Sequence, residues 1–127
     1  MQNEDPLSQL LLDAGEVDRG VLAAALSERI GIDSKSGRIV MLPGYSSLNA
    51  RQKVLVILLA AKAASLLGVR DSEFMATQEV ISISGLPQGT VRPKLKELRE
   101  AGLVSQGTDR AYYVPSALLR RAVDQLP

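Results

Sequence analysis

Lysines, arginines, amides and carboxylates are the side chains of this chain that could do chemistry, because it contains no histidine and no cysteine. Imidazole bases, thiolate metal ligands and disulfides are therefore excluded. Fourteen carboxylates are present, but no pair has a spacing typical of an acid–base site. The chain also lacks a glycine-rich phosphate loop after a strand and an EF-hand-like loop. We therefore predict a protein that is not an enzyme and that binds no cofactor or metal.

Basic side chains are concentrated between residues 87 and 121, where seven of them accompany three acidic residues. They are Arg92, Lys94, Lys96, Arg99, Arg110, Arg120 and Arg121. Side chains of this kind donate hydrogen bonds to phosphates and to base edges. Lysine-rich helical faces are also common as plain solvated surface, and the interleaved Glu97 and Glu100 favour that simpler interpretation.

Residues 88–101 have the periodicity of a helix that could present these groups. Val91, Leu95 and Leu98 recur at i, i+4 and i+7, which predicts an apolar stripe facing a core. The opposite face then carries Gln88, Gly89, Arg92 and Lys96, flanked by Lys94 and Arg99. A helix that reads DNA needs this arrangement, because one side must hold it rigidly while the other offers donors.

Pro93 lies inside this segment and leaves two alternatives for the start of the helix. If the helix starts near Gln88, the proline removes one backbone hydrogen bond and crowds the carbonyl of Gly89. If Thr90 is the N-cap, Pro93 is the third helical residue, where no intrahelical donor is lost. Gln88 and Gly89 would then leave the exposed face. Gly89 itself indicates either a close approach of a phosphate or a loose helix start.

A preceding helix and a following hairpin complete the pattern. Thr77 is expected to cap a helix over 78–84, which ends at Gly85. Residues 74–76 predict a short strand, and residues 105–106 and 111–114 predict the two strands of a hairpin. We expect Leu86 to be buried in the turn between the helices.

Successive strand residues point to opposite faces, so one of Tyr112 and Tyr113 is expected in the core. Arg110 is expected at the hairpin tip, where it either reaches a phosphate or the minor groove or is simply solvated.

The pattern TxEV…GLPxGTVR…LxxLxxxGLV, which begins at Thr77 and ends at Val104, resembles the winged helix-turn-helix transcription regulators of bacteria and archaea. The resemblance covers about residues 49–115. It implies a winged helix-turn-helix fold, double-stranded DNA as the partner, and major-groove contacts by the helix around residues 88–101. The positions that it places at the groove or its phosphates are Gln88, Gly89, Thr90, Arg92 and Lys96. Charge adds Lys94, Arg99 and Arg110 to this predicted DNA-binding set.

We expect a mainly α protein with small β-hairpins, divided into an N-terminal extension over 1–46 and a winged helix-turn-helix domain over 47–127. The extension should contain helices over 6–14 and 16–28 and a hairpin over 29–42. The sequence leaves open whether it packs on the domain or on a partner copy.

The central helix of the predicted domain follows Asn49, which forms a capping-box pattern with Gln52. The run from 54 to 67 is apolar almost all round, so this helix should be buried on most sides, and Gly68 should end it. A last apolar helix, with Ser116 as N-cap and ending near 126, should either fold back on the central helix or join a second copy. The expected homodimer rests on that segment and on the small footprint of one motif.

Charge divides unevenly along the chain. Residues 1–33 hold seven acids and two bases, a net charge of −5, whereas the remainder holds thirteen bases and seven acids, a net charge of +6. Such asymmetry favours a polyanion-facing part and a separate acidic part that could contact a protein partner, although chance variation gives the same numbers. The acidic start lacks signal-peptide features, and the longest apolar run, 54–61, is too short to cross a bilayer. We predict a cytoplasmic, DNA-binding regulator, nucleoid-associated when bound to DNA; the alternative is a winged-helix protein–protein interaction module.

Overall fold

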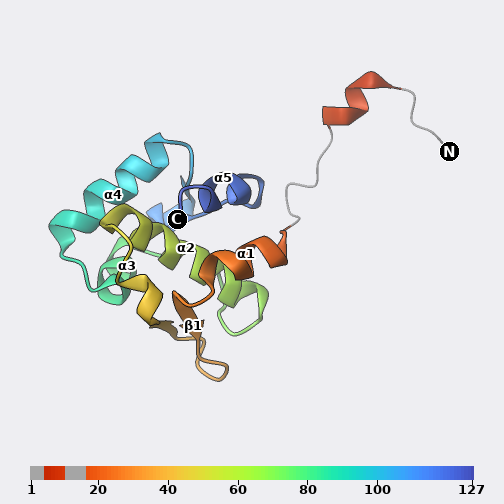
Figure 1. Ribbon diagram of the computed structural model, residues 1–127. Helices are drawn as coiled ribbons and strands as arrows, with labels where there is room; N and C mark the ends of the chain where they lie inside the picture. The colour runs from red at the N-terminus through yellow and green to blue at the C-terminus, as the bar shows by residue number, and fades with distance from the viewer. Residues whose placement is uncertain (1–4, 11–16) are drawn as a thin grey trace.

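The computed structural model describes residues 5–10 and 17–127, which are mainly helical with two small antiparallel hairpins (Figure 1). The α-helices are α1 (Arg19–Leu26), α2 (Ala50–Leu66), α3 (Thr77–Ser84), α4 (Gln88–Glu100) and α5 (Leu119–Val123). The strands are β1 (Ile30–Ile32), β2 (Ile39–Met41), β3 (Ser105–Gln106) and β4 (Tyr112–Tyr113). Short 3-10 helices cover Pro6–Leu10, Pro43–Tyr45 and Ser116–Leu118, and Thr108–Arg110 form a tight turn with left-handed backbone angles. The expected helix over 6–14 lies partly outside the described residues, as does the start of the one over 16–28.

Helix α2 forms the centre of the core, as its composition predicted. The capping box is confirmed: Gln52 N–H donates to Asn49 Oδ1 at 2.8 Å, and Asn49 N–H donates to Gln52 Oε1 at 3.0 Å. Every residue from 54 to 61 is fully buried. Helices α1, α3 and α4 and both hairpins pack around it, which explains why its sequence shows almost no polar face. Gly68, with a φ of +77°, ends the helix as expected.

Helices α3 and α4 pack on each other and on α2. The stripe of Val91, Leu95 and Leu98 is confirmed as core, with each side chain at most 1% exposed. The expected cap at Thr77 is wrong: Ala76 is the N-cap and Thr77 is the first helical residue, with no side-chain cap bond. Gly85 ends α3 with a φ of +73°, as predicted.

The second hairpin, β3–β4, pairs Ser105 with Tyr113 and Gln106 with Tyr112. The strand expected over 74–76 is reduced to one bridge, in which Met75 and Tyr112 exchange two backbone hydrogen bonds of 2.9 Å. Tyr112 is buried and Tyr113 is partly exposed, which confirms that only one of them enters the core.

The first hairpin and α1 pack on α2, so the hydrophobic core includes residues from both sides of the boundary predicted at residue 46. Helix α1 begins after Asp18, whose Oδ1 accepts from Val21 N–H at 3.0 Å, a cap that the sequence interpretation did not use. Gly37, with a φ of +73°, lies in the turn between β1 and β2, where glycine adopts the left-handed region at no steric cost.

The C-terminal segment folds back within the chain. Ser116 is the first residue of a 3-10 turn rather than a helix N-cap, and only Leu119–Val123 form α5. Leu119 and Ala122 are buried, and α5 packs on α1. Leu119 and Ala122 belong to the same hydrophobic core as α2, and Gln52 Nε2, in the first turn of α2, donates to the carbonyl of Gln125 at 3.1 Å. The apolar residues that suggested a dimer are therefore largely used inside one chain.

Candidate nucleic-acid interface

Helix α4 begins at Gln88, which settles the alternatives that Pro93 left open. The N–H groups of Thr90 and Val91 both donate to the carbonyl of Pro87, at 2.9 and 3.1 Å. Gln88 and Gly89 are therefore helical and exposed, and the alternative with Thr90 as N-cap is wrong. Pro93 lies within the helix and cannot donate to the carbonyl of Gly89. A Cβ at Gly89 would meet no atom within 4 Å, so the space beside its Cα is open.

The exposed face of α4 carries a continuous polar stripe. With 3.6 residues per turn, Gln88, Arg92, Lys96 and Arg99 fall within about 80° of helix arc. All four are exposed. The side chains of Arg92 and Lys96 make no hydrogen bond or ion pair to any other described residue. Two cationic groups are thus held on a rigid helix, about 90° and 130° of helix arc from the centre of its fully buried stripe, with their donors free.

Lys94 does not belong to this stripe. It lies about 160° of helix arc from Arg92. Its Nζ is 3.1 Å from Glu97 Oε2, and its side chain is about two-thirds buried. Thr90, another member of the predicted set, is also partly buried. The structure therefore gathers Gln88, Gly89 and the cations of the stripe, and places Lys94 and Thr90 at the side of the helix.

The β3–β4 hairpin is joined to the same stripe through one amide. Arg99 Nη1 donates to Gln106 Oε1, and Gln106 Nε2 donates to the carbonyl of Arg110 at 3.2 Å. Gln106 was not among the predicted residues, because a lone glutamine in a two-residue strand carries no pattern. Its two bonds link the backbone of the hairpin tip to Arg99 of α4.

The hairpin tip has an unusual backbone for its sequence. Asp109 and Arg110 have φ values of 61° and 60°, and Ala111 N–H faces the carbonyl of Thr108 at 3.5 Å. These are the features of a type I′ turn, which normally carries Asn-Gly or Asp-Gly. A left-handed conformation costs a residue such as arginine about 1–2 kcal/mol. The exposed Arg110 is therefore held in a conformation that glycine would adopt at lower cost.

Two ion pairs hold the loop between α2 and α3, and sequence reasoning missed both. Arg70 binds Glu79 through two hydrogen bonds of 2.8 and 2.9 Å, and the bonds to that carboxylate raise the pKa of Arg70. Lys62 is buried in α2 and binds Glu73 Oε1 at 2.8 Å. Partners nine and eleven residues apart across a loop have no fixed spacing, so no sequence signal could have paired them.

Tyr45 attaches the other end of α3. Its hydroxyl donates to the carbonyl of Ser84 at 2.9 Å, and Lys53 Nζ lies 5.4 Å from the centre of its ring. Burial raises the pKa of Tyr45 to about 12. The turn that leads from α3 into α4 is therefore fixed by a buried hydrogen bond.

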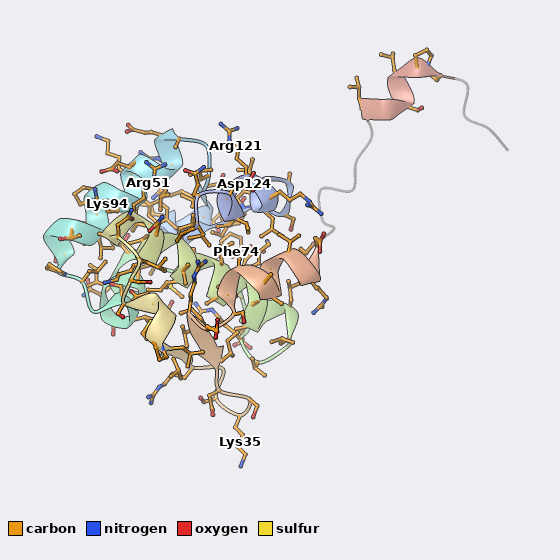
Figure 2. All side chains as sticks on the ribbon, in the orientation of Figure 1. Lys35, Arg51, Phe74, Lys94, Arg121 and Asp124 are labelled. Atoms are coloured by element: carbon orange, nitrogen blue, oxygen red, sulfur yellow. The ribbon has the colours of Figure 1, made fainter. Side chains whose placement is uncertain are left out.

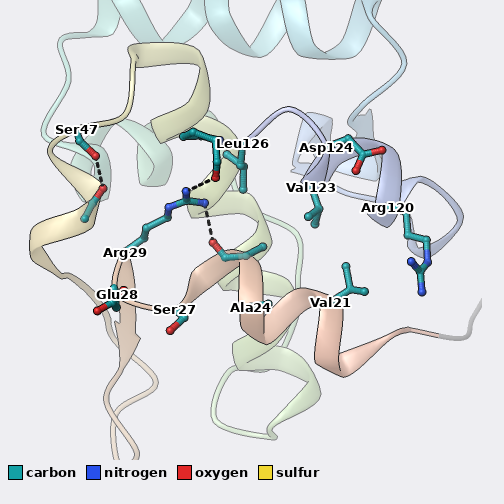
Figure 3. Close-up of a pocket in the computed structure, with 13 residues that line it drawn as sticks. Val21, Ala24, Ser27, Glu28, Arg29, Ser47, Arg120, Val123, Asp124 and Leu126 are labelled. Carbon is teal, nitrogen blue, oxygen red and sulfur yellow. Dashed lines mark hydrogen bonds between the residues drawn. The ribbon is translucent and has the colours of Figure 1, made fainter.

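A separate, open groove of about 1110 Å³ lies between α1, the 3-10 turn at Pro43–Tyr45 and α5 (Figure 3). Arg29 bridges it, donating to the carbonyls of Ala25 at 3.1 Å and Pro127 at 2.7 Å. The remaining lining mixes small and apolar residues with serines, the carboxylates of Glu28 and Asp124, and Arg120, which is ion-paired with Asp18. Within residues 5–10 and 17–127, no group of three or more acidic side chains could hold a metal ion.

Two further findings concern membrane-spanning helices and similarity to known proteins. Among the described helices, none has the length and apolar character needed to cross a membrane. No protein-family model, curated protein or solved structure matches the chain.

Proposed function

We propose that this protein is a winged helix-turn-helix transcription regulator that binds double-stranded DNA. The order α2, Met75, α3, α4, β3, β4 supports it, because that is the order of helices and strands that the resemblance implies. The observation that carries the proposal is the stripe of Gln88, Arg92, Lys96 and Arg99 on α4.

Helix α4 is the proposed reader of the major groove, which is wide enough to admit one α-helix. Gln88 and Arg92, near its N-terminal end, have the side chains that pair in bidentate fashion with adenine and guanine. Lys96 and Arg99 lie one and two turns further on and are suited to the phosphates along the groove. Arg110 would contact the backbone or the minor groove beside it, at a distance from α4 that Gln106 fixes.

Fluorescence anisotropy with a labelled duplex tests the proposal. If Lys96, Arg99 and Arg110 each neutralise one phosphate, the logarithm of the association constant should fall with the logarithm of salt concentration with a slope of roughly −2.7. Arg92→Ala and Lys96→Ala should each weaken binding, and Lys96→Ala should also make that slope shallower by up to roughly 0.9. Circular dichroism should show both variants folded, because neither side chain holds another element.

Lys35 supplies a matched control. It is an exposed lysine at the turn between β1 and β2 and lies well away from Lys94 and α4 (Figure 2). Lys35→Ala removes the same charge from the chain as Lys96→Ala, so it should leave the affinity and the salt slope almost unchanged. Equal losses in both variants would show that binding follows net charge alone. A protein that binds no duplex at low salt would overturn the proposal.

Sequence specificity needs its own test, since phosphate contacts carry no sequence information. Selection of bound sequences from a random duplex pool should return a motif, and Gln88→Ala should relax it at one position. If the selected duplexes show no common motif, the protein binds DNA without sequence specificity.

The second candidate is a winged-helix protein–protein interaction module. It is favoured by the mixed charge on α4, where Glu97 pairs with Lys94 and Glu100 is exposed beside Lys96. It predicts co-purification of a stable protein partner and no loss on Arg92→Ala. The homodimer is likewise a proposal, and a monomer mass in light scattering at high concentration would remove it.

A further inference from the structure

Two aromatic rings lie together on the outer face of the second hairpin. The rings of Phe74 and Tyr113 meet edge to face, with centroids 4.7 Å apart. Phe74 is 43% exposed and Tyr113 is partly exposed. The chain holds only four aromatic residues, and the other two, Tyr45 and Tyr112, are in the core. Half of the aromatic side chains are thus placed as a pair at the surface, although the core is built almost entirely from aliphatic residues.

The hairpin backbone is shaped to accept the Phe74 ring. A Cβ at Gly107 would lie 2.7 Å from Phe74 Cε1, so only glycine leaves room for the ring at this position. The neighbours of Tyr113 on this face are small: its cross-strand partner is Ser105, and Ala111 is two residues away along the strand. No lysine, arginine or carboxylate belongs to this face of the hairpin strands. The hairpin strands therefore place no long charged side chain beside Tyr113, and a charged group near the pair is Arg70, whose Nη2 donates to the carbonyl of Phe74 at 3.0 Å.

The hairpin separates two chemically different surfaces. Gln106 pairs with Tyr112, so it points to the opposite face from Tyr113, and there it binds Arg99 of α4. The cationic stripe therefore lies on one side of the hairpin and the aromatic pair on the other. Arg110 stands at the tip between them. A nucleic-acid strand that leaves the α4 surface past this tip would reach the aromatic pair next.

We infer that Phe74 and Tyr113 form a stacking platform for an unpaired base next to a duplex bound on α4, so that the preferred ligand is duplex DNA with a single-stranded extension. The inference rests on the proposed function and adds to it the kind of duplex end that the protein prefers. Aromatic rings bind bases by stacking regardless of sequence, because every base has a π-face. Arg110 supplies the cation for the phosphate of the strand that turns past the tip.

The test compares a short fluorescein-labelled blunt duplex with the same duplex carrying a single-stranded oligothymidine extension at either its 3′ or its 5′ end. The full-length protein should bind one of the extended duplexes roughly tenfold more tightly than the blunt one, as expected for one stacked base. Phe74→Leu should lose this preference while its binding of blunt duplex stays unchanged. Leucine still covers Gly107, so this variant keeps the apolar packing and removes only the π-face.

Leu67→Ala provides the control, because Leu67 is a 61% exposed apolar residue outside the hairpin, and it should keep the preference. Phe74→Tyr keeps the aromatic ring and should keep the preference too. Equal binding of blunt and extended duplexes overturns the platform and leaves the proposed function standing. A platform that binds a protein instead would give this same result. Absence of binding to either duplex overturns the proposed function and the platform together.

Discussion

The buried ion pair between Lys62 and Glu73 makes an asymmetric prediction about stability. The Lys62 side chain is 3% exposed and that of Glu73 is 29% exposed, and their charged atoms are 2.8 Å apart. Removing the carboxylate by Glu73→Ala leaves an ammonium group in the core without its one described partner. Removing the ammonium by Lys62→Met leaves a carboxylate that can turn toward water. The two single variants should therefore differ, although each breaks the same bond.

The magnitudes follow from the two exposures. Breaking a buried pair by removing one partner costs about 3–5 kcal/mol. Because Glu73 lies at the edge of the core, water can enter when it is removed, and we expect about 2–3 kcal/mol for Glu73→Ala. Methionine has the length of the lysine stem and no charge to desolvate, so Lys62→Met should cost less than about 1 kcal/mol. The double variant should resemble Lys62→Met.

Urea denaturation followed by circular dichroism measures these differences. The free energies of unfolding of wild type, both single variants and the double variant form a cycle with a coupling of about 2 kcal/mol. Additive losses would show that the pair has no energetic coupling. A cost of Lys62→Met equal to or above that of Glu73→Ala would refute the reasoning, because it would mean that the ammonium is well solvated in the fold.

Three further predictions concern the hairpin tip and the turn before α4. Gly107→Ala should destabilise the fold by up to about 1 kcal/mol, measured by the same denaturation, because its Cβ would lie 2.7 Å from the ring of Phe74, which is partly exposed and can turn aside. Arg110→Gly should stabilise the hairpin by up to about 1 kcal/mol, because its φ is 60°, yet weaken duplex binding; a variant that binds as wild type would remove Arg110 from the interface. The raised pKa of Tyr45, about 12, means that its contribution to stability is complete below pH 10 and is lost as pH rises toward 12. Tyr45→Phe should abolish that part of the alkaline transition and cost about 1 kcal/mol at neutral pH, since the bond to Ser84 is lost; an unchanged alkaline profile would contradict it.

Most of the local structure could be predicted because short-range rules decide it. The capping box at Asn49, the stop at Gly85 and the stripe of Val91, Leu95 and Leu98 each depend on residues within a few positions of one another, and each is confirmed. The errors lie at helix ends. Ala76 rather than Thr77 caps α3, because the preceding backbone is held by the Met75 bridge to Tyr112, a contact across 37 positions.

The candidate site also has one part that the sequence predicts and another that only the packing decides. The stripe of Arg92 and Lys96 follows from helical periodicity alone, and the sequence contains it in full. The effect of Pro93 could not be resolved from the sequence, because the earlier helix start costs one backbone hydrogen bond at Gly89 and only packing elsewhere can offset that cost. Packing of Val91 and Leu95 against α2 favours the longer helix and brings Gln88 onto the exposed face.

The sequence by itself determined the elements of this protein, its aliphatic core and the face of α4 that is polar, since all of these follow from residue type and period. Only the tertiary structure decided what those elements meet. It placed Gln106 between Arg99 and the hairpin tip, paired Phe74 with Tyr113 on the surface, and turned the apolar C-terminal segment back onto α1. Contacts between residues far apart in the chain depend on how the whole core packs, and no local pattern records that packing.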